Sequence, residues 1–166
     1  MRVIVGSGAT PSEESLSPSL IRVDLTVQVS RPVEEVFAYV TDPAKLSEWQ
    51  INLVSVTKET EGPVRSGTRF REVRRAPFGR TVEAIVEVSA YEENRRFDLR
   101  IVSGPLPIDG RNEFTGVDGS TRIEFGAEGE LRGALRLARP VLARLLHRQF
   151  ESDYARLQDA LESGRS

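Results

Sequence analysis

The sequence PVLARLLHRQFESDYARLQDAL, residues 140–161, has the pattern of one long amphipathic helix. Its large apolar side chains recur at steps of three and four, which places them on one helix face. They are Leu142, Leu145, Leu146, Phe150, Tyr154, Leu157 and Leu161. Such a helix is about 30 Å long, and its other face is too polar for a membrane span. We therefore expect it to pack against a broad apolar partner, and the rest of the chain predicts a curved sheet.

Seven stretches before this helix have the pattern of strands. The first, from Ile21 to Ser30, alternates strictly between apolar and polar residues, which predicts one buried face. Six more are predicted at about 52–59, 67–76, 80–91, 95–103, 107–117 and 120–130. Turn-forming pairs such as Gly62-Pro63 and Asp118-Gly119 separate them. The short connections favour a consecutive antiparallel meander.

Two short helices are predicted between the first and second strands. Val33, Val36, Phe37 and Val40 follow helical steps, with Ser30 as the expected N-cap. A second helix is expected from residue 44 to the tryptophan at position 49. The order of elements predicts an α+β domain over residues 20–162, with a flexible arm at 1–19 and a tail at 163–166.

The composition limits the chemistry that is available to the chain. Its 166 residues carry a net charge of −2, which gives no general attraction to nucleic acid. The absence of cysteine excludes disulfides and thiolate catalysis, and a single histidine excludes Cys/His zinc sites. We expect no cofactor and no metal. The apolar run at residues 3–5 is too short for a signal peptide, so we expect a cytoplasmic protein.

Several motifs together resemble a known superfamily. The stretch VSRPVEEVFAYVTDP at residues 29–43, continued to Trp49, resembles the opening block of the START-like, or SRPBCC helix-grip, superfamily. Gly67-Thr68 before Phe70 and Asp118-Gly119 before the last strand also fit. The most similar group is the bacterial polyketide cyclase/dehydrase and lipid-transport branch. This resemblance implies a seven-stranded curved antiparallel sheet that grips the C-terminal helix, with a cavity between them.

The candidate ligand-binding residues are those that strand and helix periodicity place on the inner side. They are Trp49, Phe70, Glu72, Arg74, Val86, Leu99, Asn112, Phe114, Phe125, Leu146 and Phe150. Gly110, Ala127 and Gly129 are small enough to leave space for an apolar ligand, or else they allow close packing of sheet on helix. Asn112 could bond a ligand or, more commonly for a buried amide, a neighbouring backbone group. Trp49 could close a cavity mouth or fill the core.

Charged residues raise the question of catalysis. Glu72 and Arg74 share a phase with Phe70, so regular alternation would turn both inward as a pair. A bulge would instead turn them to solvent, and the cost of burying charge favours solvent. His147 is the only histidine, but it lies about 100° round the helix from Leu146, at the rim. Tyr39 and Tyr154 are expected in the core with hydroxyls that reach the surface, and Asp153 and Gln149 at the solvated helix edge.

A basic segment precedes and enters the long helix. No acidic residue lies between Leu131 and Phe150, whereas five arginines interleave with leucines and valine there. They are Arg132, Arg136, Arg139, Arg144 and Arg148. This pattern fits weak contact of the last four with a membrane surface, although an ordinary solvated face is the commoner explanation. Pro140 predicts a separate helical turn at 133–139.

Three functions follow from these observations. The first is binding of a small or medium-sized hydrophobic ligand, lipid-like or polyketide-like, in a cavity between the sheet and the C-terminal helix. The second is a polyketide cyclase/dehydratase-like enzyme that uses Glu72, Arg74, Asn112 or His147. The third is a protein- or membrane-interaction module that uses the basic segment. The sequence does not decide whether a reaction is catalysed.

Overall fold

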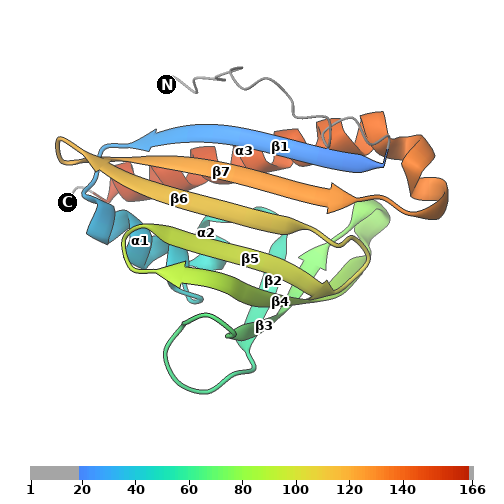
Figure 1. Cartoon of the computed structure of the whole chain (residues 1–166), viewed down its shortest axis with the longest axis horizontal. Helices are drawn as coiled ribbons and strands as arrows, with labels where there is room; N and C mark the ends of the chain where they lie inside the picture. Colours follow the sequence, from blue (N-terminus) through green and yellow to red (C-terminus); the bar gives the residue numbers. More distant parts are fainter. Residues whose placement is uncertain (1–18, 165–166) are drawn as a thin grey trace.

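The structure, a computed structural model, describes residues 19–164 and has the predicted α+β helix-grip architecture. A curved antiparallel sheet wraps one long helix, with two short helices after the first strand (Figure 1). The elements are β1 Leu20–Val29, α1 Val33–Thr41, α2 Leu46–Trp49, β2 Leu53–Lys58, β3 Arg69–Arg75, η2 Pro77–Gly79, β4 Thr81–Glu92, β5 Arg96–Ser103, β6 Asp109–Val117, β7 Ser120–Glu130, η3 Gly133–Ala138 and α3 Arg139–Ser163. The predicted arm and tail lie outside the described residues except at their inner ends.

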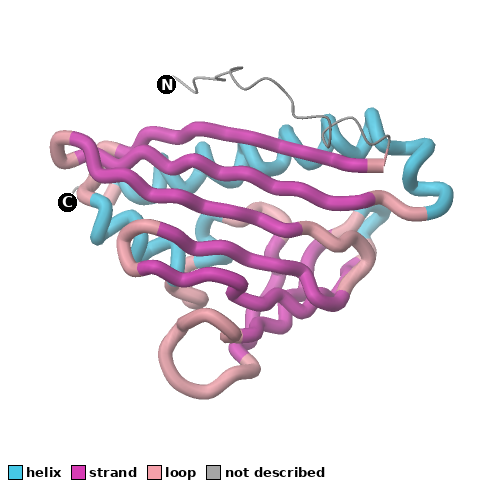
Figure 2. Tube along the Cα trace, in the orientation of Figure 1, coloured by secondary structure: helices cyan, strands magenta, loops and turns pink. Residues whose placement is uncertain are grey.

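The seven strands form one sheet in the order β1-β7-β6-β5-β4-β3-β2. The predicted meander is confirmed from β2 to β7, and β1 joins its far edge beside β7 (Figure 2). The β1–β7 register runs without interruption from Leu20 opposite Glu130 to Val29 opposite Thr121. The first and last strands of the chain, β1 and β7, are therefore hydrogen-bonded neighbours. This pairing fixes the position of α3, which follows β7.

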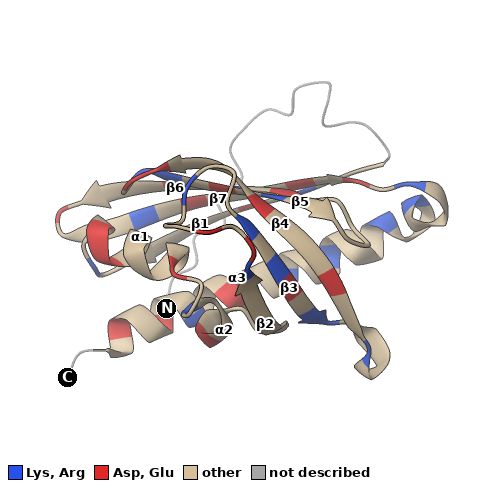
Figure 3. Ribbon diagram, turned by 90° about the horizontal axis from the view of Figure 1, so that it is seen from below, with Lys and Arg blue, Asp and Glu red and all other residues tan. Residues whose placement is uncertain are grey.

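Helix α3 lies along the concave side of the sheet, against β1 and α2 (Figure 3). Its inward apolar line runs through the half-buried Leu146 and Phe150 and then through the buried Tyr154, Leu157 and Leu161. Leu145, which we expected on this face, is 54% exposed because it lies to one side of that line. Burial is complete only in the C-terminal half of α3. Within residues 19–164, no helix is long and apolar enough to cross a membrane.

The joint between β1 and α1 is tied to the end of α3. The Ser30 N–H donates to Glu162 Oε1 at 2.9 Å, and Arg31 Nε donates to the Leu161 carbonyl at 2.9 Å. Helix α1 begins only at Val33, with Pro32 as its N-cap residue and no side-chain cap. The prediction of Ser30 as N-cap is therefore wrong, because this residue belongs to the bend that contacts α3.

Candidate functional site

Four aromatic rings meet between the sheet and α3. Trp49 at the end of α2 lies 5.4 Å from the Tyr154 ring, centroid to centroid. The Phe125 ring, on β7, lies 4.9 Å from Tyr154 and 4.8 Å from Phe150. Tilted contacts at these separations are favourable for aromatic pairs. The rings join α2, α3 and β7 into one apolar surface that includes three of the predicted ligand-binding residues.

A buried hydrogen-bonded chain crosses this surface. The Tyr154 hydroxyl donates to Asn112 Oδ1, and Asn112 Nδ2 donates to the Phe97 carbonyl at 3.0 Å. Burial raises the pKa of Tyr154, so the phenol stays neutral and acts as a donor. The expectation that the Tyr154 hydroxyl reaches the surface is wrong, because the sheet residue Asn112 bonds it in the interior. Both the oxygen and the nitrogen of the Asn112 amide are hydrogen-bonded within the protein. The bond to the Phe97 carbonyl is the contact with backbone that we considered the commoner alternative.

Glu72 and Arg74 form a pair on the inner side of β3. Arg74 Nε donates to Glu72 Oε2 at 2.8 Å, a terminal nitrogen forms an ion pair with the same oxygen at 2.7 Å, and that nitrogen donates to Gln50 Oε1 at 2.6 Å. The Glu72 side chain is only 3% exposed and that of Arg74 is 26% exposed. The solvent-facing alternative is wrong for Glu72. Strand β3 pairs with β4 in unbroken register, so no bulge turns the carboxylate outward.

Asp153 lies beside this pair and is also buried. Its Oδ1 accepts a hydrogen bond from the Ile51 N–H at 2.8 Å, and the residue is 3% exposed. Burial raises the pKa of Asp153, against the opposing effects of the Ile51 bond and the Arg74 charge. The expectation of a solvated helix edge is wrong for Asp153. The α2–β2 junction covers this side of α3, and the helical pattern alone carries no signal of that contact.

Trp49 brings an unused donor into the interior. Its Nε1 is the one buried side-chain nitrogen or oxygen atom of residues 19–164 that has no hydrogen-bond partner. The residue is 4% exposed. A buried donor without an acceptor is unfavourable by about 1–3 kcal/mol. Such an atom points either to a tolerated defect in packing or to an acceptor that a bound molecule supplies.

The apolar predicted residues divide into two groups. The first group is buried, with each residue at most 7% exposed: Trp49, Phe70, Val86, Phe114 and Phe125. Phe114 packs against Phe37 of α1 at 5.2 Å between ring centroids. The others, which pack against that core and stay partly exposed, are Leu99, Leu146 and Phe150. This second group keeps accessible surface next to the buried residues.

Two glycines on the inner face, Gly129 and Gly110, differ in how closely other atoms approach them. A Cβ on Gly129 would lie 2.6 Å from the carbonyl oxygen of Pro107, because the β5–β6 loop crosses there. A Cβ on Gly110 would lie 3.7 Å from the Phe125 ring. The close-packing alternative therefore holds at Gly129, whereas the Gly110 position has ordinary contact distances; Ala127 is buried at 3% exposure.

His147 takes no part in this cluster. Its side chain is 38% exposed and lies 3.7 Å from Glu151, one turn further along α3. His147 therefore lies at the rim, as predicted, and is not one of the acids and bases on the inner face. The described residues also contain no group of three or more histidine, aspartate or glutamate side chains that could hold a metal ion.

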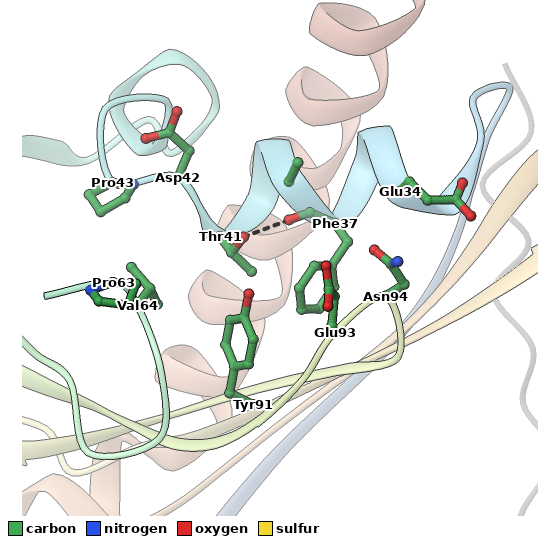
Figure 4. A pocket seen from close by; sticks show the side chains of 11 residues that line it. Glu34, Phe37, Thr41, Asp42, Pro43, Pro63, Val64, Tyr91, Glu93 and Asn94 are labelled. Carbon is green, nitrogen blue, oxygen red and sulfur yellow. Dashed lines mark hydrogen bonds between the residues drawn. The ribbon is translucent and has the colours of Figure 1, made fainter.

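A separate surface pocket of about 430 Å³ lies between α1, the loop at residues 63–64 and the β4–β5 turn (Figure 4). Phe37 and Tyr91 contribute apolar surface, and the lining contains the carboxylates Glu34, Asp42 and Glu93 with no basic residue. None of the predicted ligand-binding residues lines it. Sequence periodicity could not have found this pocket, since it forms where three separate loops and helix ends meet. Its charge disfavours an anionic ligand.

The raised pKa of Asp153 predicts a pH effect on stability. Because the folded state holds this proton more tightly than the unfolded chain, stability falls as the pH rises from about 4 through the folded pKa. Asp153→Asn keeps an acceptor for the Ile51 N–H and removes the ionisation. We expect the variant to gain stability relative to wild type over this pH range, measured by urea denaturation at a series of pH values. A difference that does not change with pH would contradict the burial argument.

The cluster between the sheet and α3 combines apolar side chains with charged groups at one edge. Aromatic and aliphatic side chains supply apolar contact, whereas Glu72, Arg74 and Asp153 supply charge at one edge. Sequence reasoning missed Gln50, Asp153 and Tyr154 as members of this cluster. Tyr154 had a detectable signal, since it lies on the apolar stripe of the helix opposite a predicted polar strand residue, Asn112.

Comparison with known families and structures gives a consistent result. The family model described as "Polyketide cyclase / dehydrase and lipid transport" matches residues 21–162. No curated protein is significantly similar in sequence. A crystal structure of TTHA0849 from Thermus thermophilus superimposes with a TM-score of 0.74 at 21% identity, covering 87% of this chain and 99% of that chain.

Two further solved structures share the fold. A START superfamily protein from Mycobacterium smegmatis has a TM-score of 0.71 at 17% identity, covering 86% of this chain and 98% of that chain. The di-domain ARO/CYC BexL from the BE-7585A biosynthetic pathway has a TM-score of 0.70 at 19% identity. That match covers 89% of this chain and 52% of BexL, so the chain is similar to about half of that protein. At these identities the similarity establishes the fold alone.

Proposed function

Because the chain belongs to the polyketide cyclase/dehydrase and lipid transport family, we propose that it binds a small or medium-sized hydrophobic ligand between the sheet and α3. The ligand class is lipid-like or polyketide-like, with an apolar body and at least one hydrogen-bond acceptor such as a carbonyl oxygen. Leu99, Leu146 and Phe150 would contact the apolar body, since each keeps accessible surface next to the core.

The observation that carries the proposal is the unpartnered N–H of Trp49. A ligand carbonyl would satisfy this donor, and the aromatic rings of Phe125 and Tyr154 would contact the adjoining apolar part. Glu72 and Arg74 would set the polarity of the neighbouring edge. A ligand that binds here replaces an unsatisfied donor with a hydrogen bond, which favours acceptor-bearing molecules over plain hydrocarbons.

Intrinsic fluorescence gives a direct test, because Trp49 is the only tryptophan in the chain. We expect titration with a long-chain methyl ketone to change the Trp49 emission in a saturable manner. Native mass spectrometry of protein purified from its own host should show a co-purifying small molecule at one per chain. The proposal fails if neither the ketone nor other apolar probes saturate and no bound molecule is found.

Trp49→Phe isolates the donor from the ring. We expect this variant to bind the ketone about fivefold more weakly, since one neutral hydrogen bond contributes about 1 kcal/mol. Binding of an alkane of the same length should be unchanged, because the aromatic surface remains. Calorimetry supplies the readout, as the variant lacks the fluorophore. Equal losses for ketone and alkane would show that Trp49 acts through packing alone.

A cyclase/dehydratase-like activity is the second candidate, and the buried acids favour it. Asp153 has a raised pKa from burial, and it lies near the Glu72–Arg74 pair. An acid of this kind could transfer a proton to or from a carbonyl-bearing chain. Conversion of a β-ketothioester over many turnovers would establish an enzyme. Stoichiometric binding without conversion of any such substrate would leave a carrier.

A further inference from the structure

The end of the molecule where η3 meets α3 carries exposed apolar side chains. Leu135 is 45% exposed, Leu137 is 89% exposed and Val141 is 62% exposed. Leu145 follows one turn later at 54%. Large aliphatic side chains in one continuous segment of this kind need either a partner or a lipid surface.

Arginines alternate with these apolar residues. Arg132, Arg136, Arg144 and Arg148 are all exposed, and none of them forms an ion pair within residues 19–164. Elsewhere on the described surface, arginines such as Arg69 and Arg71 pair with carboxylates. The positive charge of this segment is therefore local and uncompensated, in a chain whose net charge is −2.

Arg139 has a different role from its neighbours. Its Nε donates to the Leu20 carbonyl at 2.8 Å, so it fastens the start of α3 to the first residue of β1. Arg139 was expected to contact a membrane together with the other three arginines; because its Nε is bonded to β1, we assign the proposed contact to the other three. The bond holds the segment at 132–148 in a fixed orientation at the end of the sheet.

A second element presents the same chemistry at the same end. Phe78, at the tip of the β3–β4 turn, is 100% exposed, and Arg75 and Arg80 beside it are exposed as well. The turn and η3 both lie at the end of the molecule opposite the β4–β5 and β6–β7 turns (Figure 1, Figure 3). Two segments more than fifty residues apart in sequence thus place apolar and basic side chains on one end.

We propose that this apolar–basic end, residues 75–80 and 132–148, docks on an anionic lipid bilayer. Leu135, Leu137 and Phe78 would enter the boundary between head groups and acyl chains, and the arginines would meet lipid phosphates. An isologous dimer through the same end would bring arginine against arginine, which opposes self-association. Docking needs no bound ligand, so it goes beyond the proposed function and can be tested separately from it.

Flotation with lipid vesicles tests this surface on the ligand-free chain. We expect binding to vesicles of phosphatidylcholine and phosphatidylglycerol in about equal amounts, and much weaker binding to phosphatidylcholine alone. Binding should fall as sodium chloride rises from about 0.05 to 0.5 M, because the electrostatic part is screened. Each of Arg136→Gln and Arg144→Gln should lower the partition coefficient about fivefold. Leu137→Ser should lower it by at least as much, through loss of apolar insertion.

Matched controls lie at the other end of the molecule. Arg95→Gln removes an arginine with an 80% exposed side chain on the β4–β5 turn, and Val117→Ser removes a 49% exposed valine at the end of β6. Both should bind vesicles as wild type does, and thermal melting should show that every variant is folded. Absence of binding to the anionic vesicles, or equal losses in the control variants, would overturn the proposal. So would a lipid-free dimer that Leu137→Ser dissociates, seen by sedimentation velocity.

Discussion

Replacing Leu157 with alanine is expected to lower the free energy of unfolding by about 4 kcal/mol. Leu157 is fully buried in the core where α3 packs against the sheet. Its removal loses the transfer free energy of the side chain and leaves a cavity between elements that the rest of the helix holds in place. Urea denaturation followed by circular dichroism measures the loss as a shift of the midpoint at constant slope.

Leu145→Ala is the matched control, because it makes the same chemical change on the same helix. Leu145 is 54% exposed, so we expect a loss below about 1 kcal/mol. Equal losses at the two positions would mean that the sheet grips the whole length of α3. Unequal losses would show that the C-terminal half carries the stability of the fold.

That division of α3 has a functional consequence. The C-terminal half fixes the helix through Tyr154, Leu157 and Leu161, which are buried. The N-terminal half contributes partly exposed side chains, Leu146 and Phe150, and the uncompensated arginines. A helix that is anchored at one end can present its other half to a ligand or a bilayer without loss of the core that supports it.

The strands and helices could be predicted closely because each carries a local signal. Alternation defines the strands, and turn-forming residues end them, so β7 was placed at its observed bounds of 120–130. The inner faces of β4, β6 and β7 follow from the same alternation. The apolar stripe of the C-terminal helix indicates its approximate length, 140–161 against the observed Arg139–Ser163, and its buried side with the exception of Leu145.

The charged part of the site could be predicted only in part from the same signals. Asp153 is buried because the junction between α2 and β2 folds over one side of α3, and Ile51 donates a backbone hydrogen bond there. Glu72 is buried because Arg74 lies two residues away on the same strand face and partners it. The Asp153 contact is tertiary and carries no local signal. For Glu72, strand alternation offered the inward pair as one alternative, and the cost of burying a charge wrongly favoured solvent. The close approach of the β5–β6 loop to Gly129 is likewise a tertiary contact, and the sequence of β7 gives no signal of it.

Arg74→Met is expected to lower the free energy of unfolding by about 3 kcal/mol at neutral pH. The variant leaves the Glu72 carboxylate, 3% exposed in the native protein, without the cation that pairs with it and donates a hydrogen bond to it. Gln50 loses a donor as well. Arg71→Met is the control on the outer face of β3, where the arginine side chain is 48% exposed, and it should leave the urea midpoint nearly unchanged. A similar midpoint for both variants would show that Glu72 finds other partners or solvent.

The double variant Glu72→Leu with Arg74→Met decides why the pair exists. Replacement of a buried ion pair by apolar side chains of similar volume is often neutral or stabilising, so we expect the double variant to recover the stability that Arg74→Met loses. Ligand titration followed by Trp49 fluorescence then separates two roles. If the stable double variant binds the ketone as wild type does, the pair serves only the fold. If the double variant keeps its stability but no longer binds the ketone, Glu72 and Arg74 serve ligand binding. The fold would then be stable without the pair.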